Sequence, residues 1–157
     1  MKNKWLLVLC MLLSPVLVSA GNLSFLAGKA TSNQENEGTS AWQVEYEHRA
    51  GDYLGLSASY LNEGHSTEHK RDGLAAQLRV YAPIPSDRFS LSIGGGPYRW
   101  YDTQPTTISR GWAGLYGVTA SYNVTKSVIV KTTWNRVESE DLRDSDVFLI
   151  GLGYSWK

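Results

Sequence analysis

The chain has 157 residues, with 15 basic and 15 acidic residues, so its formal net charge at pH 7 is zero. This balance argues against a nucleic-acid-binding protein, which would carry an excess of Lys and Arg. The length suits a single domain. The one cysteine, Cys10, excludes a fold held together by intramolecular disulfides.

Residues 1–20 have the pattern of a secretory signal peptide. Two lysines precede an almost wholly apolar run at 5–18, and small residues at 18–20 suit cleavage. The run is too short for a membrane helix, and no later segment reaches the roughly 18 apolar residues that such a helix needs. We expect 21–157 to form one mature domain. Removing the two lysines from the 15 basic residues leaves 13 against 15 acidic ones.

Apolar and polar residues alternate with a period of two in eight stretches, the pattern of β-strands with one apolar and one polar face. The stretches are 22–30, 41–50, 53–62, 73–83, 88–101, 111–123, 127–137 and 146–156. Short connections alternate with longer, more polar ones at 31–40, 63–72, 102–110 and 138–145. An even number of strands, with short turns at one end and longer loops at the other, is typical of transmembrane β-barrels.

The final strand carries five large apolar residues on one face. They are Phe148, Ile150, Leu152, Tyr154 and Trp156. A chain that ends on such a strand resembles the C-terminal signal of bacterial outer-membrane β-barrels, although Lys157 here follows the aromatic residue. The resemblance implies a Gram-negative outer membrane and recognition of the last strand by the barrel-assembly machinery.

Aromatic residues at both ends of the apolar faces favour a membrane barrel over a soluble one. They are Trp42, Tyr60, Tyr101, Trp112 and Trp134 beside the long connections, and Phe89, Tyr122 and Trp156 beside the short turns. The opposite faces are rich in Gly and Ser, which suits the narrow lumen of an eight-stranded barrel. We predict an all-β, eight-stranded antiparallel up-and-down transmembrane barrel with a polar, side-chain-filled lumen. A soluble periplasmic barrel that binds a small apolar ligand is the alternative.

Four charged residues lie on the polar faces and are expected inside the barrel: Glu45, Glu47, Arg79 and Lys131. A buried charge is tolerated only when it is paired and hydrogen-bonded. We therefore predict a charge network in which the two glutamates neutralise the arginine and the lysine. Such a network favours a closed lumen over an ion or proton path.

The connection at 62–72 is the densest polar segment. Lys70 and Arg71 could contact lipopolysaccharide phosphates, because basic groups near a lipid surface attract anionic headgroups. His65 and His69 with nearby acids could bind a divalent metal, but their spacing has no helical context, so we predict no metal site. A solvated hairpin tip is the simplest interpretation.

The chain resembles small eight-stranded outer-membrane barrels and, among them, the lipid A 3-O-deacylases. The resemblance lies in the Gly-rich stretch 92–98 and in the ending 149–154. It implies a hydrolase with a His-x-Ser pair late in the seventh strand. The corresponding stretch 134–140 has no histidine, so that Ser139 and Glu140 lack the general base between them. A histidine from the loop at 62–72, His65 or His69, would have to supply it.

The sequence thus favours a non-enzymatic outer-membrane protein with a structural or surface-interaction role, in contact with outer-membrane lipid and lipopolysaccharide. We expect a monomer without a cofactor or a nucleic-acid partner. A lipid A-modifying hydrolase with a rearranged active site is the second interpretation.

Overall fold

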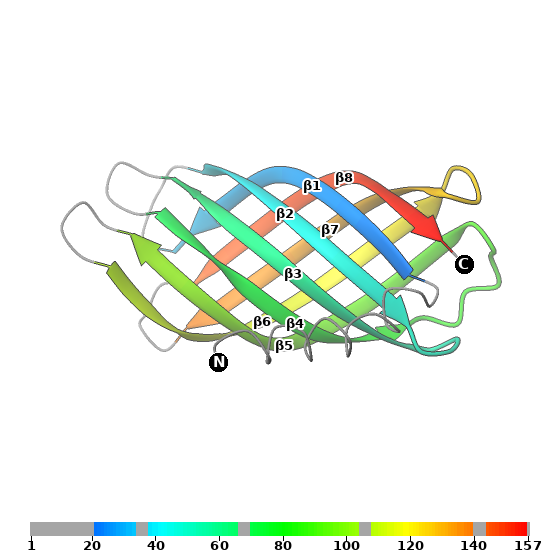
Figure 1. The fold of residues 1–157 in the computed structure, drawn as a ribbon, viewed down its shortest axis with the longest axis horizontal. Helices are drawn as coiled ribbons and strands as arrows, with labels where there is room; N and C mark the ends of the chain where they lie inside the picture. The colour runs from blue at the N-terminus through cyan, green and yellow to red at the C-terminus, as the bar shows by residue number, and fades with distance from the viewer. Residues whose placement is uncertain (1–20, 34–37, 66–69, 104–107, 140–143, 157) are drawn as a thin grey trace, which may run out of the picture.

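A computed structural model describes residues 21–33, 38–65, 70–103, 108–139 and 144–156, so the expected signal peptide lies outside the described residues. The described residues form eight β-strands (Figure 1). The strands are β1 (Gly21–Ser32), β2 (Thr39–Arg49), β3 (Leu54–His65), β4 (Lys70–Tyr81), β5 (Phe89–Thr103), β6 (Ile108–Asn123), β7 (Val128–Ser139) and β8 (Ser145–Trp156). No helix in these ranges is long and apolar enough to cross a membrane.

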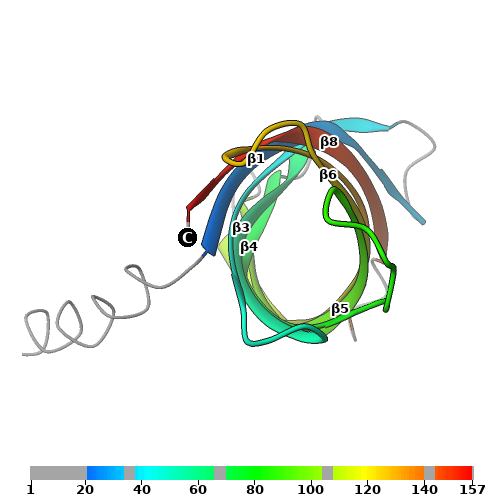
Figure 2. The same cartoon turned by 90° about the vertical axis from the view of Figure 1, so that its right-hand side faces the viewer.

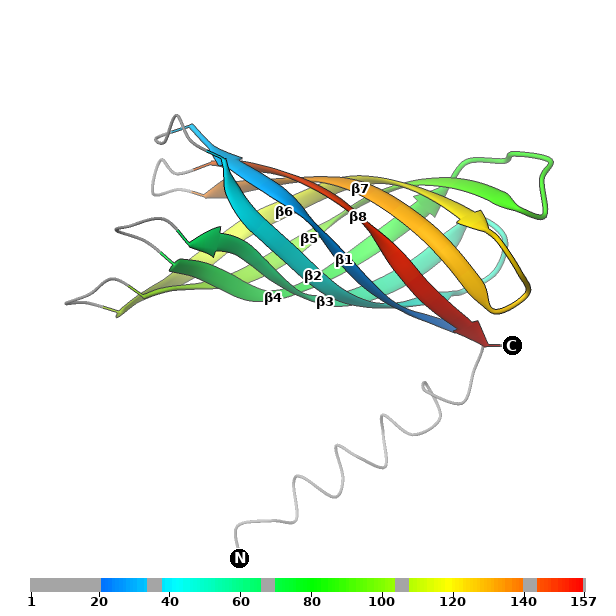
Figure 3. The same cartoon turned by 90° about the horizontal axis from the view of Figure 1, so that it is seen from above.

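The sheet closes on itself through the first and last strands. All neighbouring strands pair antiparallel in sequence order, and β1 also pairs with β8, from Gly21 opposite Trp156 to Ser32 opposite Ser145. Figure 3 shows β1 and β8 side by side, and Figure 2 shows the ring of strands along the barrel. Closure leaves no unpaired strand edge. The predicted eight-stranded antiparallel up-and-down barrel is therefore confirmed.

The strands extend further than the sequence predicted at one end of the barrel. Most of the segment 63–72, expected as a loop, is strand: β3 and β4 pair as far as His65 and Lys70. Likewise, β5 and β6 pair as far as Thr103 and Ile108. The expectation of long loops here is wrong, because polar side chains do not end a ladder of backbone hydrogen bonds. Beyond an apolar layer, outward-facing strand residues can be polar.

The outer surface of the barrel carries a belt of exposed apolar side chains. On β8, Phe148, Ile150, Leu152 and Tyr154 are each about 60% exposed, whereas Val147 and Leu149, on either side of Phe148, are buried. The same alternation runs along the other strands. A soluble barrel would expose polar residues at these positions, so this surface is suited to lipid.

Aromatic side chains border this belt. At the end away from the short turns, the ring centroids of Trp42 on β2 and Tyr60 on β3 lie 5.3 Å apart. The ring of Phe25, nearer the middle of β1, lies 6.2 Å from that of Trp42. The Tyr60 hydroxyl donates to Asp72 at 2.5 Å. At the short-turn end, the ring centroids of Trp156 and Tyr46 lie 6.0 Å apart. Rings with an apolar body and a polar tip suit membrane–water interfaces.

Two layers of side chains occupy most of the lumen. In the half nearer the short turns the inward residues are mainly polar: Asn22, Ser24, Gln43, Glu45, Glu47, Ser57, Ser59, Gln77, Arg79, Ser92, Thr119, Lys131, Thr133 and Asn135. In the other half they are apolar: Leu26, Ala30, Ala41, Leu61, Ala75, Tyr98, Trp100, Leu115, Val137, Val147 and Leu149. The sequence predicted a polar lumen, and the structure adds the apolar layer above it.

Glycines make room for the largest residues of the apolar layer. Trp100 on β5 lies opposite Gly73 on β4 and opposite Gly111 on β6. A Cβ on Gly111 would overlap the indole ring, and one on Gly73 would lie 2.7 Å from the Tyr98 ring. Eight strands enclose a space that side chains just fill, so large inward residues need small neighbours.

Candidate functional site

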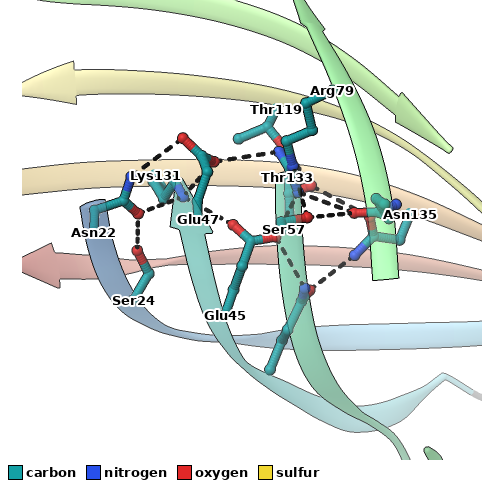
Figure 4. Close-up of polar contacts among 12 residues, drawn as sticks. Asn22, Ser24, Glu45, Glu47, Ser57, Arg79, Thr119, Lys131, Thr133 and Asn135 are labelled. Atoms are coloured by element: carbon teal, nitrogen blue, oxygen red, sulfur yellow. Dashed lines mark hydrogen bonds and ion pairs between the residues drawn. The ribbon is translucent and has the colours of Figure 1, made fainter. Parts of the chain in front are cut away.

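The four charged residues predicted for the lumen lie together in the structure. Glu45 and Glu47 come from β2, Arg79 from β4 and Lys131 from β7 (Figure 4). Lys131 Nζ lies 2.8 Å from Glu45 Oε1 and 3.0 Å from Glu47 Oε2. Arg79 forms an ion pair with Glu45 and lies 3.7 Å from Glu47. Two cations thus face two carboxylates, and the cluster is neutral.

The strand geometry explains how these residues meet. Alternate positions on β2 point inward, so Glu45 and Glu47 face the lumen while Tyr46 between them faces outward. Arg79 and Lys131 reach across the lumen from other parts of the ring (Figure 4). Space for the arginine comes from Gly94 on β5, where a Cβ would lie 3.1 Å from Arg79 Cγ.

Neutral polar side chains satisfy the remaining groups of this cluster. Arg79 Nε donates to Ser57 Oγ at 3.1 Å, and Arg79 Nη1 donates to Thr119 Oγ1 at 2.7 Å. Lys131 Nζ donates to Asn22 Oδ1 at 3.0 Å, and the Tyr81 hydroxyl donates to Glu47 at 2.7 Å. Sequence analysis missed the roles of Asn22, Ser57 and Thr119. The alternation along a strand identifies such residues as polar and facing the lumen, but it does not show which charged side chain each one contacts.

The four charged side chains of the cluster are deeply buried. Each side chain of the four is at most 5% exposed, so removing one member leaves an uncompensated buried charge. Such a loss costs about 3–5 kcal/mol. On the side away from the short turns, a mainly apolar layer borders the cluster.

A hollow of about 930 Å³ lies at the short-turn mouth of the barrel. Residues from the turns 50–53 and 82–88 line its rim, and Glu47 and Lys131 are its charged inner residues. Tyr81 lines it too, with the Arg49 guanidinium 3.9 Å from its ring centroid. Two of the four residues of the charge cluster therefore lie at the inner end of this hollow.

A second buried polar group closes the lumen at the opposite end. Glu63 on β3 receives hydrogen bonds from the Tyr98 hydroxyl, at 2.9 Å, and from Ser145. Its other partner is Arg71, whose Nε lies 3.2 Å from Glu63 Oε1. The Arg71 guanidinium also lies 5.1 Å from the Trp100 ring centroid. Glu63 and Arg71 thus cap the apolar layer and contact Tyr98 and Trp100 of that layer.

This position corrects one sequence-based expectation. Arg71 was expected in an outer loop beside Lys70, as a contact for lipopolysaccharide phosphates. It lies on β4 instead, faces the lumen and is 3% exposed, because successive strand residues face opposite sides. Lys70 faces outward and is exposed.

The residues considered for hydrolysis are not brought together in the described part of the chain. His65 lies at the end of β3 and Ser139 at the end of β7, which are on opposite sides of an eight-stranded ring. His69 and Glu140 lie outside the described residues. The backbone N–H of Ser139 donates to Asp144 at 3.3 Å. Within the described ranges no group of three His, Cys, Asp or Glu residues could hold a metal ion.

No protein-family model matches the sequence, and no curated protein matches it. Solved structures match the fold. The N-terminal β-barrel domain of Pseudomonas aeruginosa OprF superimposes with a TM-score of 0.63 at 11% identity, covering 86% of this chain and 97% of that one. Neisserial surface protein A gives a TM-score of 0.63 at 15% identity, covering 87% of this chain and 96% of that one. Ail, the attachment invasion locus protein of Yersinia pestis, gives a TM-score of 0.57 at 11% identity, covering 87% of this chain and 97% of that one.

The chain has the fold of small outer-membrane barrels. At these identities the likeness concerns the fold alone. It agrees with the outer-membrane localisation predicted from the sequence. The finer resemblance to lipid A deacylases finds no support in these matches.

Proposed function

We propose that this chain is an integral outer-membrane barrel with a sealed lumen and a non-enzymatic, structural or surface-interaction role. The observation that carries the proposal is the exposed apolar belt between two aromatic borders on a closed barrel. Only helices and closed barrels satisfy their backbone hydrogen bonds in lipid. A soluble barrel that binds an apolar ligand would carry its apolar face inside, with polar residues outside.

The lumen supports a structural role rather than transport. The charged cluster, the apolar layer and the Glu63 group succeed one another along the barrel axis, and each is buried. An ion would have to leave water and cross a layer that is mainly apolar, which is costly. We therefore expect the protein to conduct no ions.

Surface contact with lipopolysaccharide is supported by basic residues that face outward above the apolar belt. Lys70 on β4 and Arg110 on β6 are exposed, and neither forms an ion pair with the described residues. Arg99 on β5 faces the same side, two positions below Tyr101. These cations could bind lipid phosphates. We also propose that the protein is monomeric and that the barrel-assembly machinery recognises β8.

The proposal is tested by folding, conductance and lipid analysis. The refolded protein should shift in mobility on a gel when heated, and it should insert into vesicles without giving channel currents in planar bilayers. Lipid A from cells with and without the protein should have the same acyl chains by mass spectrometry. Acyl loss that depends on the protein, and disappears in Ser139→Ala or His65→Ala, would support the hydrolase instead.

A further inference from the structure

The outer surface of β5, β6 and β7 is hollowed by a groove of about 610 Å³. Its lining residues are Pro97, Trp112, Ala113, Gly114, Tyr116, Glu138 and Ser139. The register places Pro97 opposite Gly114, and Gly114 opposite Glu138, so the floor crosses three strands. Trp112 and Tyr116 are 64% and 51% exposed and form the two walls. Gly114 between them has no side chain, and the Tyr116 ring lies against it, since a Cβ there would come within 3.0 Å of that ring.

The groove begins at the border of the apolar belt and runs into it. Trp112 belongs to the aromatic border predicted at the end away from the short turns, and Arg110 lies beyond it on the same face of β6. In the other direction the outward residues of β6 are Tyr116 and Val118, both exposed. Since side chains of alternate residues share a face, the groove connects headgroup level with the lipid-facing surface. Its shape and apolar walls suit an acyl chain.

Charge is distributed unevenly around this groove. The Arg99 guanidinium lies 5.1 Å from the Trp112 ring centroid, and the two residues are direct partners in the β5–β6 ladder. An arginine stacked on an aromatic face keeps its N–H edge available for phosphate. On the opposite edge, Glu138 is exposed. A phosphate is therefore favoured on the β5 side and disfavoured on the β7 side.

We propose that this groove binds lipid A of the outer leaflet, with one acyl chain between Trp112 and Tyr116 and one phosphate on Arg99. The proposal rests on the outer-membrane function proposed above and gives the lipopolysaccharide contact a defined site. Arg110 and Lys70, outward on neighbouring strands, extend the positive surface toward the sugar and phosphate level. The groove accommodates the acyl chain, and Arg99 gives the site its preference for a phosphorylated lipid.

The test is lipid retention by the refolded protein in detergent, measured by native mass spectrometry after addition of hexa-acylated, bisphosphorylated lipid A. Gly114→Leu blocks the groove, because the leucine displaces the Tyr116 ring and occupies the space beside Trp112. Arg99→Gln removes the phosphate contact. Each variant should lower the apparent affinity about tenfold or more, as expected for loss of a charge-assisted contact or of a buried chain. Ala58→Leu on β3 is the matched control, because it also places a leucine on the lipid-facing surface, away from the groove.

Lipid A without phosphates separates the two parts of the site. It should bind the unmodified protein about tenfold more weakly, and Arg99→Gln should not weaken it further. The site proposal is overturned if Gly114→Leu and Ala58→Leu retain lipid A equally, or if Arg99→Gln has no effect. If Gly114→Leu does not show the heat-dependent gel shift, this variant has not folded, and the lipid A affinity of Arg99→Gln alone tests the site. If the unmodified protein inserts into vesicles but retains no lipid A, only this site fails and the outer-membrane function stands.

Discussion

Lys131 Nζ on β7 lies 2.8 Å from Glu45 Oε1 on β2, although the two residues are 86 positions apart in the sequence. The same ammonium lies 3.0 Å from Glu47 Oε2. One cation therefore joins two consecutive inward positions of β2 across the lumen. The barrel can bury these charges because Arg79 supplies the second cation and neutral side chains accept or donate the remaining hydrogen bonds.

Replacing the lysine should strongly destabilise the barrel. Lys131→Met leaves two buried carboxylates with one cation, and we expect the free energy of unfolding to fall by about 3–5 kcal/mol. Urea-induced unfolding of the refolded protein in vesicles measures this. Adding Glu47→Gln restores a neutral cluster, so the double variant should be more stable than Lys131→Met alone.

Lys126→Met is the control for that experiment, because Lys126 is exposed in the turn between β6 and β7. It should change the free energy of unfolding by less than about 0.5 kcal/mol. Equal losses for Lys131→Met and Lys126→Met would contradict a stabilising charge cluster.

Arg79→Met should lower the unfolding temperature in detergent without opening a pore. The substitution breaks the ion pair with Glu45, but Leu61, Leu115 and Val137 of the apolar layer remain fully buried above the cluster. Thermal unfolding and single-channel recording in planar bilayers check the two parts separately. Large channel currents, from either the variant or the unmodified protein, would show that the lumen is not sealed.

A charge on the lipid-facing surface should destabilise the barrel according to its depth. Ile150 is 63% exposed near the middle of β8, where an arginine costs about 2–4 kcal/mol if lipid surrounds it. Ser40 faces outward near the start of β2, beyond the apolar belt, and Ser40→Arg should cost about 0–1 kcal/mol. Urea unfolding in vesicles compares the two variants. Equal effects would argue that Ile150 does not meet lipid.

Two glycines with positive φ allow a matched comparison of backbone strain. Gly51 has φ 95° in the turn before β3, and a Cβ there would meet no atom within 4 Å. Gly51→Ala should therefore cost only the left-handed conformation, about 1–2 kcal/mol. Gly64 has φ 100° at the β3 irregularity, and its Cβ would overlap the Thr39 side chain.

Gly64→Ala should thus be less stable than Gly51→Ala by about 1–3 kcal/mol, because Thr39 must move and its 2.8 Å hydrogen bond to the Glu63 carbonyl weakens. Denaturant unfolding of the two variants under the same conditions measures the difference. If Gly64→Ala is as stable as Gly51→Ala, the close packing at this irregularity contributes nothing.

The sequence alone determined the strands and their sides. A period of two is a local property, so alternation along β8 already separates Ile150, which faces out, from Leu149, which faces in. The same parity placed Glu45, Glu47, Arg79 and Lys131 on one side of the sheet. Because two acidic and two basic side chains inside a closed barrel are costly to bury unpaired, the sequence also predicted that they pair.

Only the tertiary structure decided how the inward residues meet and where the strands end. The strand ends depend on backbone pairing between neighbours, which is why the polar residues beside His65 and Lys70 were mistaken for a loop. The same error placed Arg71 at the surface instead of beside Glu63. The groove beside Trp112 arises from the register of three strands, and no single strand encodes it. Period fixes which side a residue faces, whereas closure and register fix its neighbours.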